Sequence, residues 1–170
     1  DTDSLDVEIG GVDLKPATEF LKESDLPNIK GMFWRHNIVG FAPMLAVNVT
    51  VDGKQVALVG TYFHHDFKYG NDAYQTGVQT VYPYWKVEGS WPRDSAPEIL
   101  LGEKLAADTG RNIGDTVTVA GQNLKVVGLL STGGVEESQI VAPLAVAQQI
   151  GGHPGAVSKV YVSAMTKPED

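Results

Sequence analysis

Apolar and polar residues alternate most regularly around residue 52, where two β-rich runs flank a turn signal. The runs cover residues 45–51 and 55–62, and Asp52-Gly53 between them supplies two positions that tolerate positive φ. This pattern predicts an antiparallel β-hairpin. Pro43 separates the hairpin from an aromatic and apolar stretch at 33–41.

Helical spacing appears closer to the amino terminus. Pro16 suits the first turn of a helix, and apolar side chains follow it on one face, at Ala17, Phe20 and Leu21. Polar residues occupy the other face, at Glu19, Lys22 and Glu23. We therefore expect a short amphipathic helix here.

The second half of the chain begins with a strand followed by a helix. Residues 98–101 form a short apolar run between Pro97 and Gly102, which predicts a buried strand. Residues 103–108 are helix formers, and Gly110 closes that segment.

A second hairpin and a second helix follow. Residues 116–119 and 124–127 are β-rich and are separated by turn residues at 121–123, which predicts the hairpin. Pro143 suits the first turn of a helix and Gly151 its left-handed cap, so residues 143–150 are expected to form a short helix on the sheet. A return strand is expected at 157–163.

Composition narrows the class of protein. The chain has 170 residues, of which 42% are hydrophobic, and this is enough to bury a substantial core. Thirteen basic against 21 acidic residues give a formal charge of −8 without a basic cluster, which argues against nucleic acid as a partner. The absence of cysteine excludes disulfides and thiolate metal sites. No run approaches the roughly eighteen apolar residues that a membrane span needs.

The order and spacing of the segments after residue 97 are more specific than any one of them. The chain carries Glu98–Ala106, then Gly114–Val119, then Lys125–Leu130, and finally Ile140–Leu144 with Ala147-Gln148-Gln149. This series resembles the extracytoplasmic (periplasmic core) domain of MacB-type, FtsX-like permeases of ABC transporters.

The resemblance implies an α+β fold with two subdomains. A porter-like α/β subdomain would be split in sequence, over residues 1–84 and 151–170. A small β-rich subdomain would be inserted between its halves, over residues 85–150. We expect the two to share one rigid body.

The resemblance also implies the function. The chain would be a non-catalytic domain of a longer membrane protein, on the periplasmic face of the bacterial inner membrane. It would couple ATP hydrolysis on a separate cytoplasmic ABC ATPase subunit to substrate movement or partner engagement outside the membrane, by mechanotransmission. The expected partners are that ATPase, a second permease in a dimer, and a periplasmic protein. A stand-alone secreted binding domain is the alternative.

The densest group of potential metal ligands is His64, His65 and Asp66. Imidazole and carboxylate together suit zinc, copper or iron, so this group could make the domain a metal-binding module of a metal-transport permease. Adjacent histidines on a strand point to opposite faces, and sharing one ion would require irregular backbone. The alternative is a solvated loop. Beyond this divalent metal, no cofactor is expected in the domain.

Aromatic residues beside prolines form a second candidate site. The residues are Tyr82, Tyr84, Trp85 and Trp91, and Pro83 and Pro92 lie among them. Large aromatics in such a setting can anchor a partner or a permease dimer, and the alternative is ordinary core packing.

Catalytic and phosphate-binding motifs are missing from the sequence. It contains no Gly-x-Ser-x-Gly and no Gly-x-x-x-x-Gly-Lys-Ser/Thr, so we expect no enzyme and no ATP site in this chain. The paired carboxylates Glu136-Glu137 follow Gly133-Gly134 and are interpreted as a solvated turn.

Overall fold

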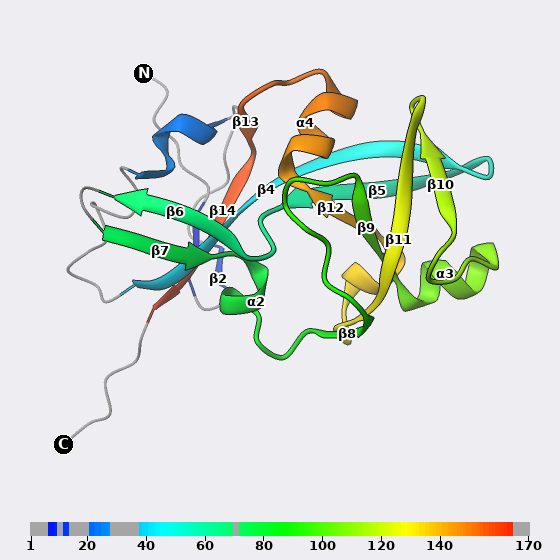
Figure 1. Cartoon of the computed structure of the whole chain (residues 1–170), viewed down its shortest axis with the longest axis horizontal. Coiled ribbons are helices and arrows are strands. Elements are labelled where there is room, and N and C mark those ends of the chain that lie inside the picture. Colours follow the sequence, from blue (N-terminus) through cyan, green and yellow to red (C-terminus); the bar gives the residue numbers. More distant parts are fainter. Residues whose placement is uncertain (1–6, 10–11, 14–20, 28–37, 70–71, 165–170) are drawn as a thin grey trace.

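The computed structural model describes residues 7–9, 12–13, 21–27, 38–69 and 72–164, and Figure 1 shows their arrangement. Within these ranges a mixed sheet of ten strands forms the body, in the order β10-β11-β9-β12-β5-β4-β14-β1-β2, with β8 also pairing with β11. Its strands are β1 (Val7–Ile9), β2 (Val12–Asp13), β4 (Ile38–Val51), β5 (Lys54–Thr61), β8 (Lys86–Gly89), β9 (Glu98–Gly102), β10 (Thr116–Val119), β11 (Gln122–Ser131), β12 (Ile140–Pro143) and β14 (Lys159–Ala164).

Smaller elements surround this sheet. Two further strand pairs join β3 (Leu21–Lys22) to β13 (Ala156–Val157) and β6 (His65–Tyr69) to β7 (Asp72–Thr76). The helices are α2 (Val78–Val81), α3 (Glu103–Thr109) and α4 (Leu144–Gly151), with 3-10 turns η1 (Glu23–Asp25) and η3 (Val135–Ser138). In the described ranges no helix is long and apolar enough to cross a membrane. The expected α+β class is confirmed.

The predicted hairpin at Asp52-Gly53 is confirmed. β4 and β5 pair from Met44↔Thr61 to Val51↔Lys54, and both turn residues adopt positive φ, 50° at Asp52 and 79° at Gly53. However, Pro43 does not interrupt β4, which runs through it from residue 38. Pairing with β5 starts only at Met44, and the Pro43 carbonyl accepts the Thr61 hydroxyl at 2.7 Å. At this position no N–H is required for a ladder bond to β5.

The helix expected around Pro16 falls mostly on residues 14–20, which lie outside the described residues. At its carboxyl end the prediction is wrong, because Leu21-Lys22 is a strand that pairs with Ala156-Val157. Pairing with a distant segment overrides the local helical spacing there.

The predicted elements of the second half are confirmed, with shifted ends. β9 and α3 follow one another as expected, and Gly110 caps α3 at φ 67°. The β10–β11 turn lies at Ala120-Gly121, so β11 starts at Gln122, earlier than the sequence suggests. Gly151 is the last residue of α4, and Gly152 takes the left-handed cap in its place.

The expected return strand is present in two pieces. β13 and β14 are separated at Ser158, whose N–H and hydroxyl both donate to the Met44 carbonyl, at 2.8 Å and 3.0 Å. β14 then pairs antiparallel with β4 and parallel with β1, so the last described strand lies between two early ones.

The main sheet is continuous across the subdomain boundary placed at residues 84/85. β12 pairs in parallel with β5, and α4 packs on β4 and β5, although residues up to 150 were assigned to the insertion. The division into residues 1–84 with 151–170 and residues 85–150 stays a prediction.

Helix α4 approaches the sheet closely where β5 has Gly60. A methyl group at Gly60 would overlap the Ala147 Cβ and crowd the Leu144 backbone. Ala147 and Leu144 are both buried, at 0% and 2% exposure. The absence of a side chain on Gly60 therefore sets the distance between α4 and the sheet.

Gly60→Ala is expected to lower the free energy of unfolding by about 1–3 kcal/mol, because it overpacks a buried contact. Ala147→Gly alone should cost about 1 kcal/mol through helix propensity. In the double variant the removed Cβ makes room for the added one. The double variant should therefore lose less stability than the sum of the losses in the two single variants. Urea unfolding of the four proteins measures this coupling, and strictly additive costs would contradict the proposed contact.

Candidate functional site

The histidine cluster lies where β5 leads into β6. His64 Nε2 lies 2.8 Å from Gln75 Oε1, and the Gln75 amide donates to Asp66 Oδ1 at 3.1 Å. The His65 ring stacks instead on Tyr62, with 3.8 Å between centroids. The two histidines thus point in different directions, as expected for neighbours entering a strand.

Gln75 connects His64 to Asp66, but His65 does not join them. Over the ranges that the structure describes, no three histidine, aspartate or glutamate side chains cluster closely enough to hold a metal ion. The metal site at His64, His65 and Asp66 stays a prediction.

Tyr62, on which His65 stacks, is itself part of a partly buried polar contact. Its hydroxyl donates to Glu23 Oε2, and the Gln148 amide donates to Glu23 Oε1 at 3.1 Å. Burial, together with the Glu23 carboxylate, raises the pKa of Tyr62 well above its ordinary value. This contact fastens η1 to the end of β5 and to α4.

Three of the four aromatic residues singled out in the sequence form one cluster. The Tyr82 ring stacks on Trp85, with centroids 4.8 Å apart and planes 9° apart, and it meets Tyr84 edge-on at 6.0 Å. Trp85 is buried at 8% exposure, whereas Tyr84 is 62% exposed. Trp91 packs separately, tilted against Phe63 at 6.1 Å. The structure therefore brings together Tyr82, Tyr84 and Trp85 and leaves Trp91 apart.

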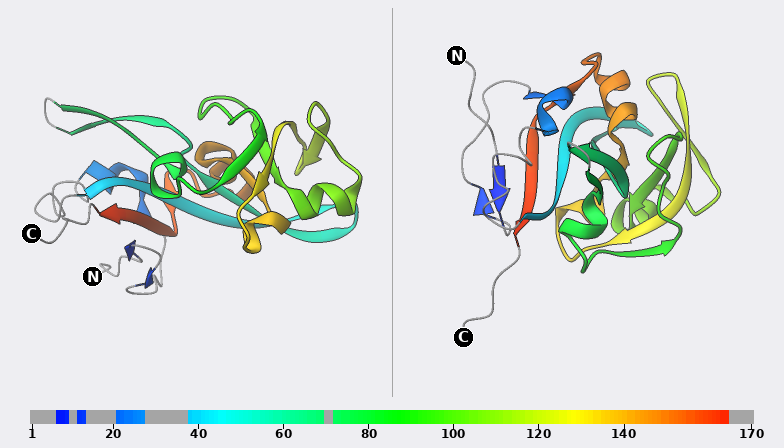
Figure 2. Two further views of the ribbon diagram at one scale, coloured as in Figure 1. Left: turned by 90° about the horizontal axis from the view of Figure 1, so that it is seen from below. Right: turned by 60° about the vertical axis from the view of Figure 1, so that its left-hand side comes forward.

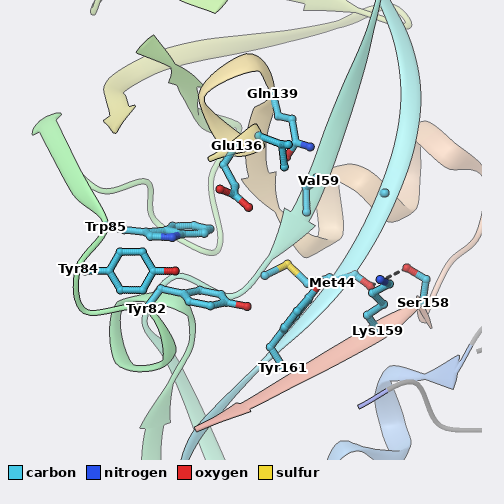
Figure 3. A pocket seen from close by; sticks show the side chains of 12 residues that line it. Met44, Val59, Tyr82, Tyr84, Trp85, Glu136, Gln139, Ser158, Lys159 and Tyr161 are labelled. Atoms are coloured by element: carbon cyan, nitrogen blue, oxygen red, sulfur yellow. Dashed lines mark hydrogen bonds between the residues drawn. The ribbon is translucent and has the colours of Figure 1, made fainter. Parts of the chain in front are cut away.

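The aromatic cluster forms one wall of a groove of about 530 Å³ (Figure 3). Its floor comes from the central strands β4 and β5, its second wall from β14 and the preceding Ser158, and its third from η3 and Gln139. The lining residues are Met44, Ala46, Val59, Tyr82, Tyr84, Trp85, Val135, Glu136, Gln139, Ser158, Lys159 and Tyr161.

The third wall is held in place by a buried carboxylate. Glu137 is only 5% exposed, and its Oε2 accepts the N–H groups of Thr132 at 2.9 Å and Gly133 at 2.7 Å. These backbone bonds, that of Gly133 first, hold the pKa of Glu137 below its ordinary value. The Lys104 ammonium lies 3.8 Å from the other oxygen. A solvated turn at Glu136-Glu137 was the wrong interpretation for Glu137, because loop N–H groups replace water around its charge.

Glu136 lies on the opposite side of the same turn and lines the groove. Its Oε1 accepts the Thr132 hydroxyl at 2.8 Å, and its side chain is half-buried. Beside it, Val135 is 71% exposed at the rim, across the groove from the exposed Tyr84. Two of the large apolar side chains most exposed among the described residues therefore flank this one groove.

Sequence reasoning found the aromatic wall but missed the other two. Met44, Lys159 and Tyr161 meet only because β14 returns beside β4, and nothing in their local sequence signals this. Val135, an isolated apolar residue after Gly133-Gly134, was the one local signal for the rim. The Ser158 hydroxyl, at the start of the second wall, donates to the backbone carbonyl of Met44 in the floor.

The family model described as MacB-like periplasmic core domain matches residues 8–170. Among solved structures, the extracellular domain of the noncanonic ABC-type transporter YknZ from Gram-positive bacteria is similar, with a TM-score of 0.65 and 18% identity over 86% of this chain and 74% of that one. The periplasmic region of MacB from Actinobacillus actinomycetemcomitans is similar with a TM-score of 0.63 and 15% identity over 88% and 67%. No curated protein sequence matches the chain.

The buried carboxylate predicts an acid-dependent contribution to stability. The pKa of Glu137 is lower in the folded state than the ordinary 4.5, so the folded chain binds fewer protons than the unfolded chain does. The contribution is therefore complete above pH 4.5 and is lost as the pH falls through the folded-state pKa. Glu137→Gln should reduce the melting temperature at neutral pH and flatten its fall in acid, as measured by thermal unfolding from pH 7 to pH 2. Glu103→Gln, at an exposed position on α3, is the control; equal acid dependence of both variants would contradict the assignment.

Proposed function

The chain belongs to the MacB-like periplasmic core domain family and is the extracytoplasmic domain of an ABC transporter permease; from this premise we propose that it acts as a mechanical arm. In this proposal, ATP is hydrolysed on a cytoplasmic ABC ATPase subunit, and the resulting rearrangement of the permease moves this domain. The domain itself is non-catalytic. Family membership favours this role over that of a stand-alone secreted binding domain.

The observation that carries the proposal is the position of the first and last described strands. β1 and β14 pair side by side in parallel near one end of the elongated body, and β10, β11 and α3 lie at the other end (Figures 1 and 2). Displacement applied near the first end is amplified at the far end if the body is stiff.

Stiffness is supported by the sheet that joins the two ends. The order β10-β11-β9-β12-β5-β4-β14-β1 runs from the far end to β1 without a break. The tip of the β4–β5 hairpin is also fastened to the far end, because Arg111 binds Asp52 at 2.9 Å. This ion pair is partly exposed and adds little energy, but it restrains the tip.

Partners follow from the same proposal. A second permease in a dimer and a periplasmic protein would contact the outward surface of the arm. The sequence-predicted contact residues are Tyr82, Tyr84, Trp85 and Trp91, and Tyr84 is the most exposed of the four. Their role in a partner or dimer contact stays a prediction.

The test is a distance measurement across the permease dimer. A spin label on Thr116→Cys, exposed on β10 at the far end, reports the distance between the two copies in the full-length permease with its ATPase. We expect a shift of several ångströms between the nucleotide-free and the ATP-trapped states, because the arm rotates with the membrane helices.

The matched control is a label on Ser24→Cys, exposed in η1. It lies nearer to the end where β1 and β14 pair, so the same rotation should displace it less. Identical distance distributions at Thr116 in both nucleotide states would refute the mechanical proposal.

A further inference from the structure

We propose that the groove binds a small organic cation: a quaternary or protonated onium centre attached to an apolar body. This assignment goes beyond the proposed function, since it gives the domain a ligand class whether or not the domain moves. It stands on the volume of the groove, on the geometry of its aromatic wall, and on the placement of one carboxylate.

The size and lining of the groove suit a small molecule. About 530 Å³ falls within the roughly 300–1,000 Å³ typical of ligand pockets, and such pockets are mostly apolar with a few polar groups. Met44 and Val59 provide an apolar floor from the two central strands. The apolar body of the ligand would rest on this floor.

The three rings of the aromatic wall and Tyr161 from the second wall meet around Tyr82. Trp85 stacks on Tyr82 at 4.8 Å, and Tyr84 and Tyr161 meet it at steep angles of 78° and 61°, at 6.0 Å and 5.8 Å. Rings turned at such angles offer π-faces in more than one direction, and π-faces attract cations, tryptophan most strongly. Four rings in one cluster therefore favour a positively charged centre beside them.

Glu136 supplies the charge that selects a cation over a neutral ligand. Figure 3 shows its carboxylate directed toward the aromatic wall, while the Thr132 hydroxyl binds Oε1 from the loop. Glu137, next in sequence, is bound separately by its own loop N–H groups, so of these two carboxylates only Glu136 lines the groove. Lys159 lines the opposite wall, which places the cationic centre at the Glu136 end. The net charge of −8 further favours the approach of cations.

Two ions of nearly the same shape and opposite charge provide the test. Titration calorimetry of the 170-residue chain with tetraphenylphosphonium should show one micromolar site. Tetraphenylborate should bind at least about tenfold more weakly, since it meets Glu136 with the wrong sign. Equal affinity for the two ions, or no heat with the phosphonium, would overturn the assignment.

Variants locate the site. Glu136→Gln keeps the oxygen that accepts the Thr132 hydroxyl and removes the charge, and it should weaken phosphonium binding about tenfold. Tyr84→Ala removes a largely exposed ring and should weaken binding several-fold without lowering the melting temperature. Glu103→Gln and Ile113→Ala, a charge and an exposed apolar side chain outside the groove, should leave affinity unchanged. Wild-type affinity in both groove variants would likewise refute the proposal.

Discussion

The architecture depends on the short strand β12, which is inserted between β5 and β9. Its four residues are all buried, it pairs in parallel with β5, and it pairs antiparallel with β9. A strand covered on both faces and paired on both edges has little freedom to slip in register, because any shift would expose apolar side chains and leave backbone groups unpaired. This one pairing joins the β4–β5 hairpin of the first half to the β9–β11 strands of the second.

The groove is a consequence of that junction. η3 leads directly into β12, so the register of β12 fixes where Val135 and Glu136 stand relative to the floor on β4 and β5. The turn itself approaches β9 so closely that Gly102 has no room for a side chain against the Glu137 backbone. The Glu137 carboxylate then holds the loop by accepting the N–H groups of Thr132 and Gly133. Glu136 and Glu137, adjacent in sequence, thereby serve different purposes: one stabilises the wall and the other faces the groove.

The sequence predicted those elements whose signals are local. Asp52-Gly53 determines a hairpin through two backbone conformations, and Gly110 ends α3 in the same way, so both could be read without knowing the fold. Leu21 was misassigned because its pairing partner, Val157, lies far away in sequence. Glu137 was misassigned because a charged pair after two glycines usually meets water, and only the folded loop reveals N–H groups aimed at it. The walls contributed by β14 and η3 were unpredictable for the same reason, whereas the aromatic wall, encoded within four residues, was visible.

The position of β14 also constrains how the domain can form. β4 offers its outer edge over residues 38–44 to β14, and β1 pairs with Val160 to Val162 of the same strand. Neither contact exists until the last described strand has been synthesised, and contacts between such distant segments form slowly. A chain that is still crossing the membrane therefore carries an open strand edge on β4 until β14 arrives, which is the kind of edge that recruits other chains. The arrival of β14, the last described strand, thus removes this open edge of β4 from the newly formed domain.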